Sequence, residues 1–240
     1  MGILATIMEE IRVVRDRDPA IHTDWEIFLY PSFHALLAYR RAHWLYEKGH
    51  FFLARLVSQR SAGRTRIEIH PGAQIGSGFF IDHGTGVVIG ETTIIGNNVT
   101  LYQGVTLGGT GKETGKRHPT IGDNVMIGSG AKVLGNIHIG NNCKIAAGAV
   151  VLKDVPDNCT VVGVPGRVVK MLKPGVNDLD QIHIPDPVRT DIECLNRGQS
   201  ALTNQLLEQE MEIRTLRAEL ARVRRILENR REGNDGDTDL

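Results

Sequence analysis

The chain has 240 residues and a formal net charge of zero, with 28 basic and 28 acidic side chains. Such a balance supplies no long-range field that would attract nucleic acid or an anionic membrane, so we expect neither as a partner. No apolar run approaches the ~20 residues that span a bilayer, and the early Glu9 and Glu10 argue against a signal peptide. The three cysteines are scattered and form no CxxC pair, so we expect reduced thiols in a cytoplasmic protein.

Residues 1–62 are predicted to form an α-helical domain. The first helix is expected over Gly2–Arg15, where apolar residues recur with a helical period and Asp18-Pro19 follows. A second is expected over Pro31–Glu47, because proline suits an early helical position. A third, shorter helix is expected over Phe51–Gln59.

From Ile69 onward the hydrophobic period changes to six. The period-six positions are Ile69, Ile75, Ile81, Ile89, Ile95, Leu101, Leu107, Ile121, Ile127, Val133, Ile139, Ile145 and Val151. Neither a helix nor a strand has this period. A coil with three flat sides does, because each hexad then supplies one side, one inward aliphatic residue and one small corner residue. Residues 63–173 are therefore predicted to form a parallel β-helix whose stacked coils share one core.

Two interruptions break this period. Ile81 and Ile89 are eight residues apart, so two are extra near Asp82-His83-Gly84. Leu107 and Ile121 are fourteen apart, so eight are extra, ending near Arg117-His118. A solenoid accommodates insertions as loops at a corner, often on its binding face. Both interruptions bring a histidine beside a charged residue, which marks them as candidate functional positions.

The C-terminal part has a different composition. Residues 174–194 are expected to be a linker, and residues 195–231 a coiled-coil helix, with residues 232–240 disordered. The coiled coil is indicated by a 3-4 spacing through Leu195, Gln199, Leu202, Leu206, Gln209, Ile213, Leu216, Leu220, Val223 and Leu227. The alternative is a single amphipathic helix that folds onto the rest of the chain.

Several stretches together resemble bacterial serine O-acetyltransferase. They are VRDRDPAI, FHALLAYRRAHWL, IEIHPGAQIG, IDHGTGVVIGET and QGVTLGGTGKETGKRHPTIGD, with GNIHIGNNCKIAAGAVVLKDVP and VVGVPGRVV continuing the match. The resemblance covers residues 10–172 approximately and implies a left-handed parallel β-helix preceded by an α-helical domain. It further implies transfer of acetyl from acetyl-CoA to L-serine, giving O-acetyl-L-serine and CoA in the first step of cysteine biosynthesis. A homotrimer or dimer of trimers, L-cysteine as feedback inhibitor and no permanently bound cofactor are also implied.

The resemblance assigns His83 and Glu68 to catalysis. His83 lies in the first interruption and matches the family's general base, which removes the serine hydroxyl proton. Imidazole suits this role because it titrates near neutral pH, and a hydroxyl attacks well only as its proton leaves. Glu68 precedes His83 by fifteen residues, nearly one coil, and matches the acid that orients the histidine. Many members have Asp there, so this chain carries a side chain one methylene longer.

The resemblance also assigns substrate contacts. Arg117 and His118 match the family's binder of the substrate carboxylate, and a guanidinium can grip a carboxylate through two parallel hydrogen bonds. Asp18 and Asp82 match the acids that hold the ammonium group. Acetyl-CoA is expected in a groove between neighbouring solenoids. By family position, the residues that contact it are Gly109, Ser129, Lys144 and Ala147.

Three alternatives stay open at this point. His70, His83 and His118 could form a three-histidine zinc site. The charges of Asp18, Asp82 and Arg117 fit a zwitterionic ligand better than a metal ion. The acceptor could instead be homoserine or a sugar, but a sugar offers no carboxylate for the arginine. The chain could also act mainly as a scaffold for O-acetylserine sulfhydrylase, which family members bind through a C-terminal tail that usually ends in Ile, whereas this sequence ends in Asp239-Leu240.

Overall fold

The computed structural model describes residues 3–109, 111, 114–171 and 187–234. It divides into two units, Met1–Pro187 and Val188–Leu240, which we describe separately. Residues 174–186 of the linker expected over 174–194, and the last six residues of the expected tail, lie outside the described residues.

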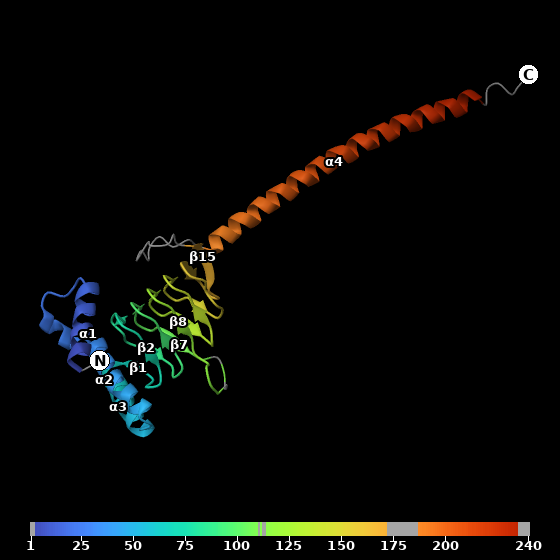
Figure 1. Ribbon diagram of the computed structural model, residues 1–240. Helices are drawn as coiled ribbons and strands as arrows, with labels where there is room; N and C mark the ends of the chain where they lie inside the picture. Colours follow the sequence, from blue (N-terminus) through green and yellow to red (C-terminus); the bar gives the residue numbers. More distant parts are fainter. Residues whose placement is uncertain (1–2, 110, 112–113, 172–186, 235–240) are drawn as a thin grey trace, which may run out of the picture. The chain divides into compact units, whose positions relative to one another are not determined.

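The first unit opens with a helical segment (Figure 1). Its elements are α1 (Ile3–Arg17), the 3-10 helix η1 (Asp24–Leu29), α2 (Pro31–Glu47) and α3 (Phe51–Thr65). The bounds of α2 are as predicted. Helix α3 continues six residues beyond the predicted end, because it packs on the first strand and its last residue, Thr65, is buried there and donates a hydrogen bond of 2.9 Å to the Ser61 carbonyl. Arg66 then ends the helix in the left-handed region with φ 62°.

Fifteen short strands follow. They are β1 (Ile67–Ile69), β2 (Gln74–Ile75), β3 (Phe80–Ile81), β4 (Val87–Ile89), β5 (Ile94–Ile95), β6 (Thr100–Leu101), β7 (Thr106–Gly108), β8 (Thr120–Ile121), β9 (Met126–Ile127), β10 (Lys132–Leu134), β11 (His138–Ile139), β12 (Lys144–Ile145), β13 (Val150–Val151), β14 (Cys159–Val162) and β15 (Arg167–Met171).

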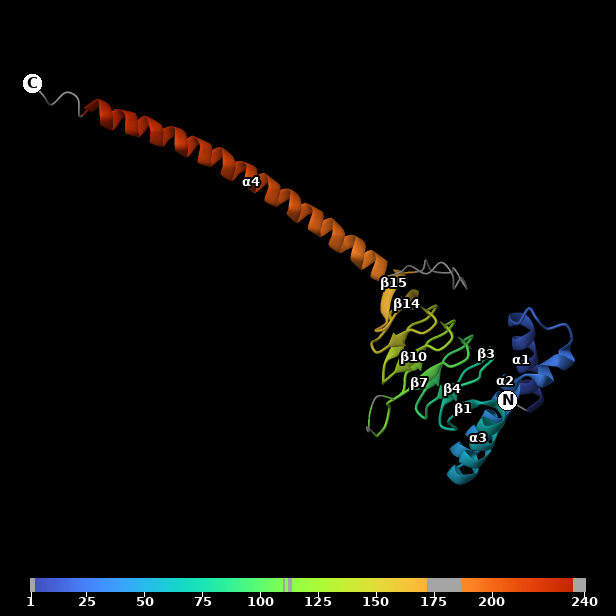
Figure 2. The same cartoon turned by 180° about the vertical axis from the view of Figure 1, so that it is seen from behind.

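These strands form the three faces of a parallel β-solenoid. Sheet A has the order β1-β4-β7-β10-β13, sheet B has β11-β8-β5-β2, and sheet C has β15-β14-β12-β9-β6-β3. Every third strand therefore returns to the same sheet, one coil further on, as Figures 1 and 2 show. The exception to parallel pairing is β15, which runs antiparallel to β14 at the last coil.

The predicted period of six is confirmed residue by residue. All thirteen predicted inward residues are buried, and they stack in register, for example Ile89 on Leu107 and Leu107 on Val133. A regular coil takes eighteen residues, as from Val133 to Val151. The coil from Ile69 to Ile89 takes twenty, and the coil from Leu107 to Val133 takes twenty-six. The interruptions thus add two and eight residues while the register of the core is kept.

The helical segment covers the first coil of the solenoid. Tyr39 on α2 donates a hydrogen bond of 2.7 Å to the Ala73 carbonyl, and Arg40 donates one of 2.9 Å to the Ile75 carbonyl. At the end of α1, Arg17 reaches the hydroxyl of Thr100 on sheet C at 2.6 Å. The bonds from Tyr39 and Arg40 satisfy carbonyl groups of a coil that has no preceding neighbour, which is how a solenoid end avoids an open sheet edge.

The second unit is one helix, α4 (Pro187–Asn234). It begins eight residues earlier than predicted, with proline at a first-turn position where its missing N–H costs nothing. Cys194 on α4 is exposed, whereas Cys143 and Cys159 are buried in the solenoid, as expected of small apolar side chains. None of the described helices is long and apolar enough to cross a bilayer.

Candidate active site

His83 lies at the corner between sheet C and sheet A, just after β3. Its backbone has φ 55°, in the left-handed region that few residues with a side chain adopt. The corner is held by two amides: Asp82 N–H donates to the Leu101 carbonyl at 2.8 Å, and Gly84 N–H donates to the Asp82 carbonyl at 2.6 Å. The His83 side chain is exposed. A strained, exposed histidine in a register interruption is typical of a functional side chain.

Both predicted substrate-binding acids, Asp18 and Asp82, lie near this corner. Tyr30 donates its phenolic proton to Asp18, whose other oxygen accepts the Ala20 N–H at 2.8 Å. The pKa of Tyr30 is raised to about 12, first by this hydrogen bond, then by burial and by the charges of nearby carboxylates that include Asp82. The carboxylates of Asp18 and Asp82 therefore both raise the pKa of Tyr30, although the two residues are 64 positions apart in the sequence.

Asp82 also lines a cavity of about 460 Å³ on the outer side of sheet C. The cavity lies between the end of α1, which contributes Asp16 and Arg17, and strands of sheet C, which contribute Thr100 and Met126. Its volume is within the range of small-molecule sites. The acidic residues at this corner favour a cationic group such as an ammonium.

Glu68 lies in β1, opposite Val88 in the adjacent strand β4. Glu68 is therefore paired with a residue five positions after His83 in the sequence. Among the described residues, neither the Glu68 carboxylate nor the His83 imidazole makes a side-chain hydrogen bond. The orienting role of Glu68 stays a prediction.

The predicted CoA contacts divide between two corners. Ser129 and Ala147 continue the His83 corner along the solenoid: Gly148 N–H donates to the Ser129 carbonyl at 2.8 Å. Three coil steps separate the His83 coil from the Ala147 coil, about 14 Å at the spacing of paired strands. Lys144 is on the preceding strand β12 and is 4% exposed, so its charge is not open to solvent in the single chain. Gly109 lies at a different corner, after β7.

Arg117 and His118 lie at the corner between sheet A and sheet B, where the eight-residue interruption ends. They contact Glu91 and Thr92, which form the same corner one coil earlier. The Thr92 hydroxyl accepts the N–H groups of Arg117 at 3.0 Å and His118 at 3.1 Å. Glu91 forms an ion pair with the Arg117 guanidinium and accepts the Tyr46 hydroxyl proton at 3.1 Å.

The contacts of His118 determine its tautomer. Thr92 N–H donates to His118 Nδ1 at 3.2 Å, and the Thr92 hydroxyl lies 2.9 Å from the same atom. A backbone N–H can only donate, so Nδ1 is unprotonated and the neutral ring carries its proton on Nε2. Burial lowers the pKa of His118, and the neighbouring Arg117 charge lowers it further, against an opposing effect of Glu91. His118 is thus a neutral hydrogen-bond donor through Nε2.

The two corners are at opposite ends of sheet A. His118 packs against Gly90, because a Cβ placed on Gly90 would lie 2.0 Å from His118 Cδ2. Gly86 to Gly90 is four residues of extended chain, about 13 Å, and His83 lies beyond Gly86. One chain therefore brings Asp18, Asp82 and His83 to one corner, and Arg117 and His118 to the other.

Sequence reasoning missed Tyr30, Tyr46, Glu91 and Thr92. Glu91 and Thr92 belong to the IDHGTGVVIGET stretch that supported the resemblance, but nothing in their spacing shows which later residues stack on them. His70, the third histidine of the zinc alternative, accepts the Gly72 N–H on Nδ1 at 3.0 Å. Burial lowers its pKa.

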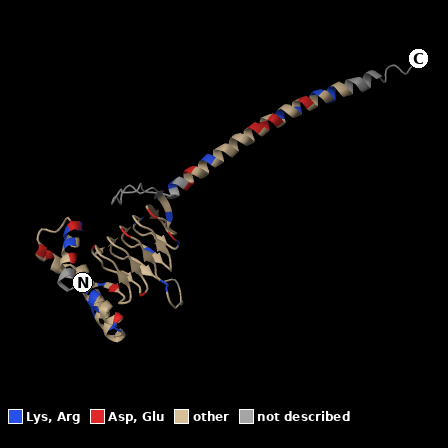
Figure 3. Ribbon diagram, in the orientation of Figure 1, with Lys and Arg blue, Asp and Glu red and all other residues tan. Residues whose placement is uncertain are grey.

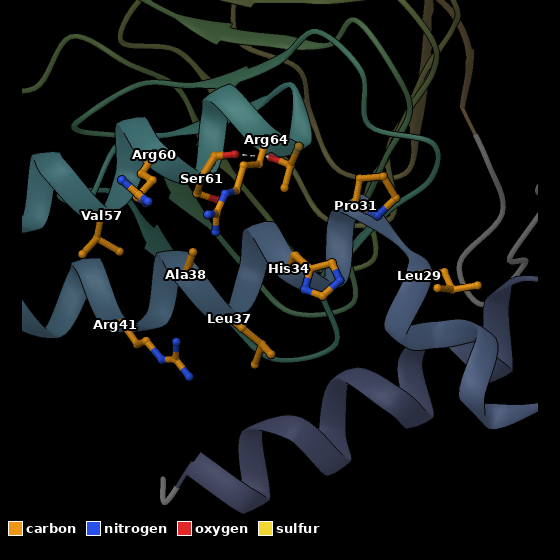
Figure 4. Close-up of a pocket in the computed structure, with 11 residues that line it drawn as sticks. Leu29, Pro31, His34, Leu37, Ala38, Arg41, Val57, Arg60, Ser61 and Arg64 are labelled. Carbon is orange, nitrogen blue, oxygen red and sulfur yellow. Dashed lines mark hydrogen bonds between the residues drawn. The ribbon is translucent and has the colours of Figure 1, made fainter.

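Two other candidate sites, the three-histidine zinc site and a hollow in the helical segment, do not match this pair of corners. Within one copy of the chain the three histidines of the zinc alternative do not converge, since His83 is at the opposite end of sheet A from His118, and the described residues contain no cluster of three metal-ligating side chains. A hollow of about 700 Å³ lies between α2 and α3 (Figure 4). It is lined by His34, Arg41, Arg60 and Arg64 and contains none of the predicted site residues.

Comparison with known proteins agrees with this architecture. Residues 118–153 match the family described as bacterial transferase hexapeptide (six repeats), which places the solenoid among hexapeptide-repeat transferases. The serine acetyltransferase of Bacillus subtilis is 58% identical over 193 residues, covering 80% of this chain and 89% of that protein. The serine acetyltransferase of Synechococcus elongatus is 52% identical over 202 residues, covering 84% and 83% respectively. The chain belongs to the serine acetyltransferase family.

Solved structures of this family share the fold. The serine acetyltransferase of Neisseria gonorrhoeae in complex with serine is 46% identical, with a TM-score of 0.67 over 70% of this chain and 69% of that one. The enzyme of Brucella abortus in complex with coenzyme A is 47% identical, with a TM-score of 0.68 over 71% and 68%. A serine acetyltransferase complex with cysteine is 46% identical, with a TM-score of 0.67 over 70% of each chain.

Proposed function

We propose that this chain transfers the acetyl group of acetyl-CoA to the hydroxyl of L-serine, giving O-acetyl-L-serine and CoA. The observation that carries the proposal is the pair of corners described above. One holds a strained, exposed His83 beside acidic residues, and the other holds Arg117 with a neutral histidine donor. Together they offer a base, anions for an ammonium and donors for a carboxylate, which are the groups that an amino-acid acceptor with a hydroxyl requires. Relatives that carry the serine acetyltransferase name support the same choice.

The reaction needs no covalent enzyme intermediate. His83 takes the serine hydroxyl proton while the oxygen attacks the thioester carbonyl, and Glu68 orients the imidazole. The new C–O bond forms, the tetrahedral intermediate collapses and the C–S bond breaks. The imidazolium then returns its proton to the departing CoA thiolate, so the base is regenerated for the next turnover.

Substrate binding divides between the same two groups of residues. Asp18 and Asp82 hold the ammonium of serine, and Arg117 with the Nε2–H of His118 holds its carboxylate. Acetyl-CoA extends along the corner of Ser129 and Ala147, whose backbone groups run in a straight column from the His83 coil. Lys144 and Gly109 are the remaining proposed contacts to the cofactor, which is a co-substrate and not permanently bound.

The complete site requires more than one copy of the chain. In one copy the base and the carboxylate binder are separated by the length of sheet A, too far for one serine to reach both. A cyclic homotrimer solves this, because the sheet A–sheet B corner of one solenoid can face the sheet C–sheet A corner of the next. We therefore propose a homotrimer or a dimer of two such trimers, which light scattering distinguishes by mass.

An assay of CoA release distinguishes the acceptors. We expect turnover with L-serine and far less with L-homoserine or a sugar, because a longer side chain displaces the hydroxyl and a sugar lacks the carboxylate. Equal or greater rates with either rival would overturn the choice of acceptor. No release with any acceptor would favour the scaffold alternative, which a pull-down with O-acetylserine sulfhydrylase tests directly.

A further inference from the structure

The Glu91-Thr92 corner contains a side chain with an unusual number of contacts to the carboxylate-binding pair. The hydroxyl of Thr92 accepts the amides of Arg117 and His118 and lies 2.9 Å from His118 Nδ1. A hydroxyl has one proton and two lone pairs, so it accepts both amides and donates to the ring nitrogen. Every hydrogen-bonding position of this oxygen is therefore used to hold two residues one coil away.

We propose that Thr92 is a positioning residue for the reaction, which sets the tautomer of His118 and the direction of the Arg117 backbone. This inference rests on the proposed function, since it assumes that Arg117 and His118 bind the carboxylate of the acceptor. With both a hydroxyl and an amide directed at Nδ1, the ring must present Nε2–H as a donor, and it cannot act as a second base. Glu91 supports the arrangement through its ion pair with Arg117.

Three variants test the role of the hydroxyl. Thr92→Val keeps the shape and removes the oxygen, Thr92→Ser keeps the oxygen, and Thr120→Val is the matched control. Thr120 is on the neighbouring strand β8, and its hydroxyl has no side-chain hydrogen bond among the described residues. We expect Thr92→Val to lower kcat/KM for serine on the order of tenfold to a hundredfold, with KM for acetyl-CoA within about twofold. Thr92→Ser and Thr120→Val should stay close to the parent.

A spectroscopic readout separates this proposal from the proposed function. In the parent protein with ¹⁵N-labelled histidine, we expect His118 Nδ1 to give the signal of an unprotonated nitrogen at neutral pH. Thr92→Val should shift that signal through loss of the hydroxyl contact, while Nδ1 stays unprotonated because residue 92 keeps its N–H. That result stands even if serine is not the acceptor. Parent-like serine kinetics in Thr92→Val, failure of Thr92→Ser to restore them, or a protonated Nδ1 in the parent would each overturn the role of Thr92.

A second, independent observation concerns α4. The described apolar residues of the predicted heptads, which include Leu195, Leu202, Leu206 and Leu220, are between 49% and 72% exposed. They form one continuous stripe along the helix, and an exposed stripe of this length marks an interface. Both acidic and basic residues occur along α4 beside this stripe (Figure 3).

The charges beside the stripe indicate which partner covers it. With Ile213 and Leu220 at position a of the heptad, Glu212 and Glu219 occupy position g, and Arg217 and Arg224 occupy position e. In a parallel, in-register coil, position g of one helix faces position e of the next heptad on the other helix. Glu212 then faces Arg217 and Glu219 faces Arg224.

An antiparallel coil reverses this benefit, because position g then faces position g and sets the glutamates against each other. We therefore infer that α4 pairs with α4 of other copies of this chain, in parallel and in register. A cyclic trimer with its threefold axis along the coil also requires this parallel orientation. The coil thus joins copies within one assembly and does not link separate assemblies.

Cysteine crosslinking tests orientation and register in the full chain. The background carries Cys194→Ser, because Cys194 is exposed while the other two cysteines are buried. We expect Leu220→Cys to crosslink to itself under mild oxidation, while Asn204→Cys, on the outer face of the same helix, stays uncrosslinked. In an antiparallel coil, chains with Leu220→Cys would instead crosslink to chains with Leu202→Cys when the two are mixed. Neither variant would crosslink when oxidised by itself. That outcome, or no crosslink in any sample, would overturn the inference.

Discussion

Gly90→Ala tests whether the position of His118 matters, without removing any polar group. A Cβ at this residue would lie 2.0 Å from Cδ2 and 2.2 Å from Nε2 of His118, whereas ordinary contact begins at 3.4 Å. The imidazole must therefore move by about 1.4 Å, since the interior is too closely packed to absorb the methyl elsewhere. A movement of this size exceeds the tolerance of the 2.9 Å and 3.2 Å contacts with Thr92.

A displacement of about 1 Å in a positioned group costs on the order of a hundredfold in rate. We therefore expect kcat/KM for serine in Gly90→Ala to fall about a hundredfold, with KM for acetyl-CoA little changed. The assay is CoA release at varied serine, and circular dichroism confirms that the solenoid remains folded. Gly63→Ala is the control, because a Cβ at that helical position meets nothing within 4 Å. Parent-like serine kinetics in a folded Gly90→Ala protein would refute the assignment of His118 to the substrate.

The other predictions concern catalysis, recognition, inhibition and stability. His83→Ala should lower turnover by roughly 10²–10⁴ while the assembly stays folded, and near-parent turnover would exclude His83 as the base. Arg117→Lys keeps the charge but loses the planar fork, so the KM for serine should rise about tenfold to a hundredfold while that for acetyl-CoA barely moves. L-cysteine should compete with serine, because it replaces only OH by SH; inhibition that a serine titration does not relieve would place cysteine elsewhere. Burial raises the pKa of Glu10 from 4.5 to about 7, so its contribution to stability is complete below pH 4.5 and is lost as pH rises through 7. Glu10→Gln should therefore be more stable than the parent at pH 8, by about 3 kcal/mol at most in urea unfolding, and nearly equal at pH 4.

The sequence alone determined the solenoid and the places where it is interrupted. Each coil repeats the same local requirement, an inward aliphatic residue every sixth position, so the pattern can be read without knowledge of distant contacts. The register of the stacked strands and the two and eight extra residues follow from that pattern. The identities of His83 and Arg117 as candidates followed from their place in the interruptions together with the family resemblance.

The ends of elements were less well predicted, because they depend on neighbours. Helix α3 extends to Thr65 through its packing on the first coil, a contact that the local sequence does not encode. Helix α4 begins at Pro187, since proline opened the helix where the composition alone indicated a linker.

Only the tertiary structure decided how the candidate residues are grouped. Thr92 holds Arg117 and His118 across 25 and 26 residues, because an insertion of eight residues brings those two back over the preceding corner. The same coil geometry places His83 at the opposite end of sheet A from them. Which side chains meet depends on the corner of the solenoid at which each insertion lies, and on which groups bond to the Thr92 hydroxyl. A periodic pattern of apolar residues contains no information on either point.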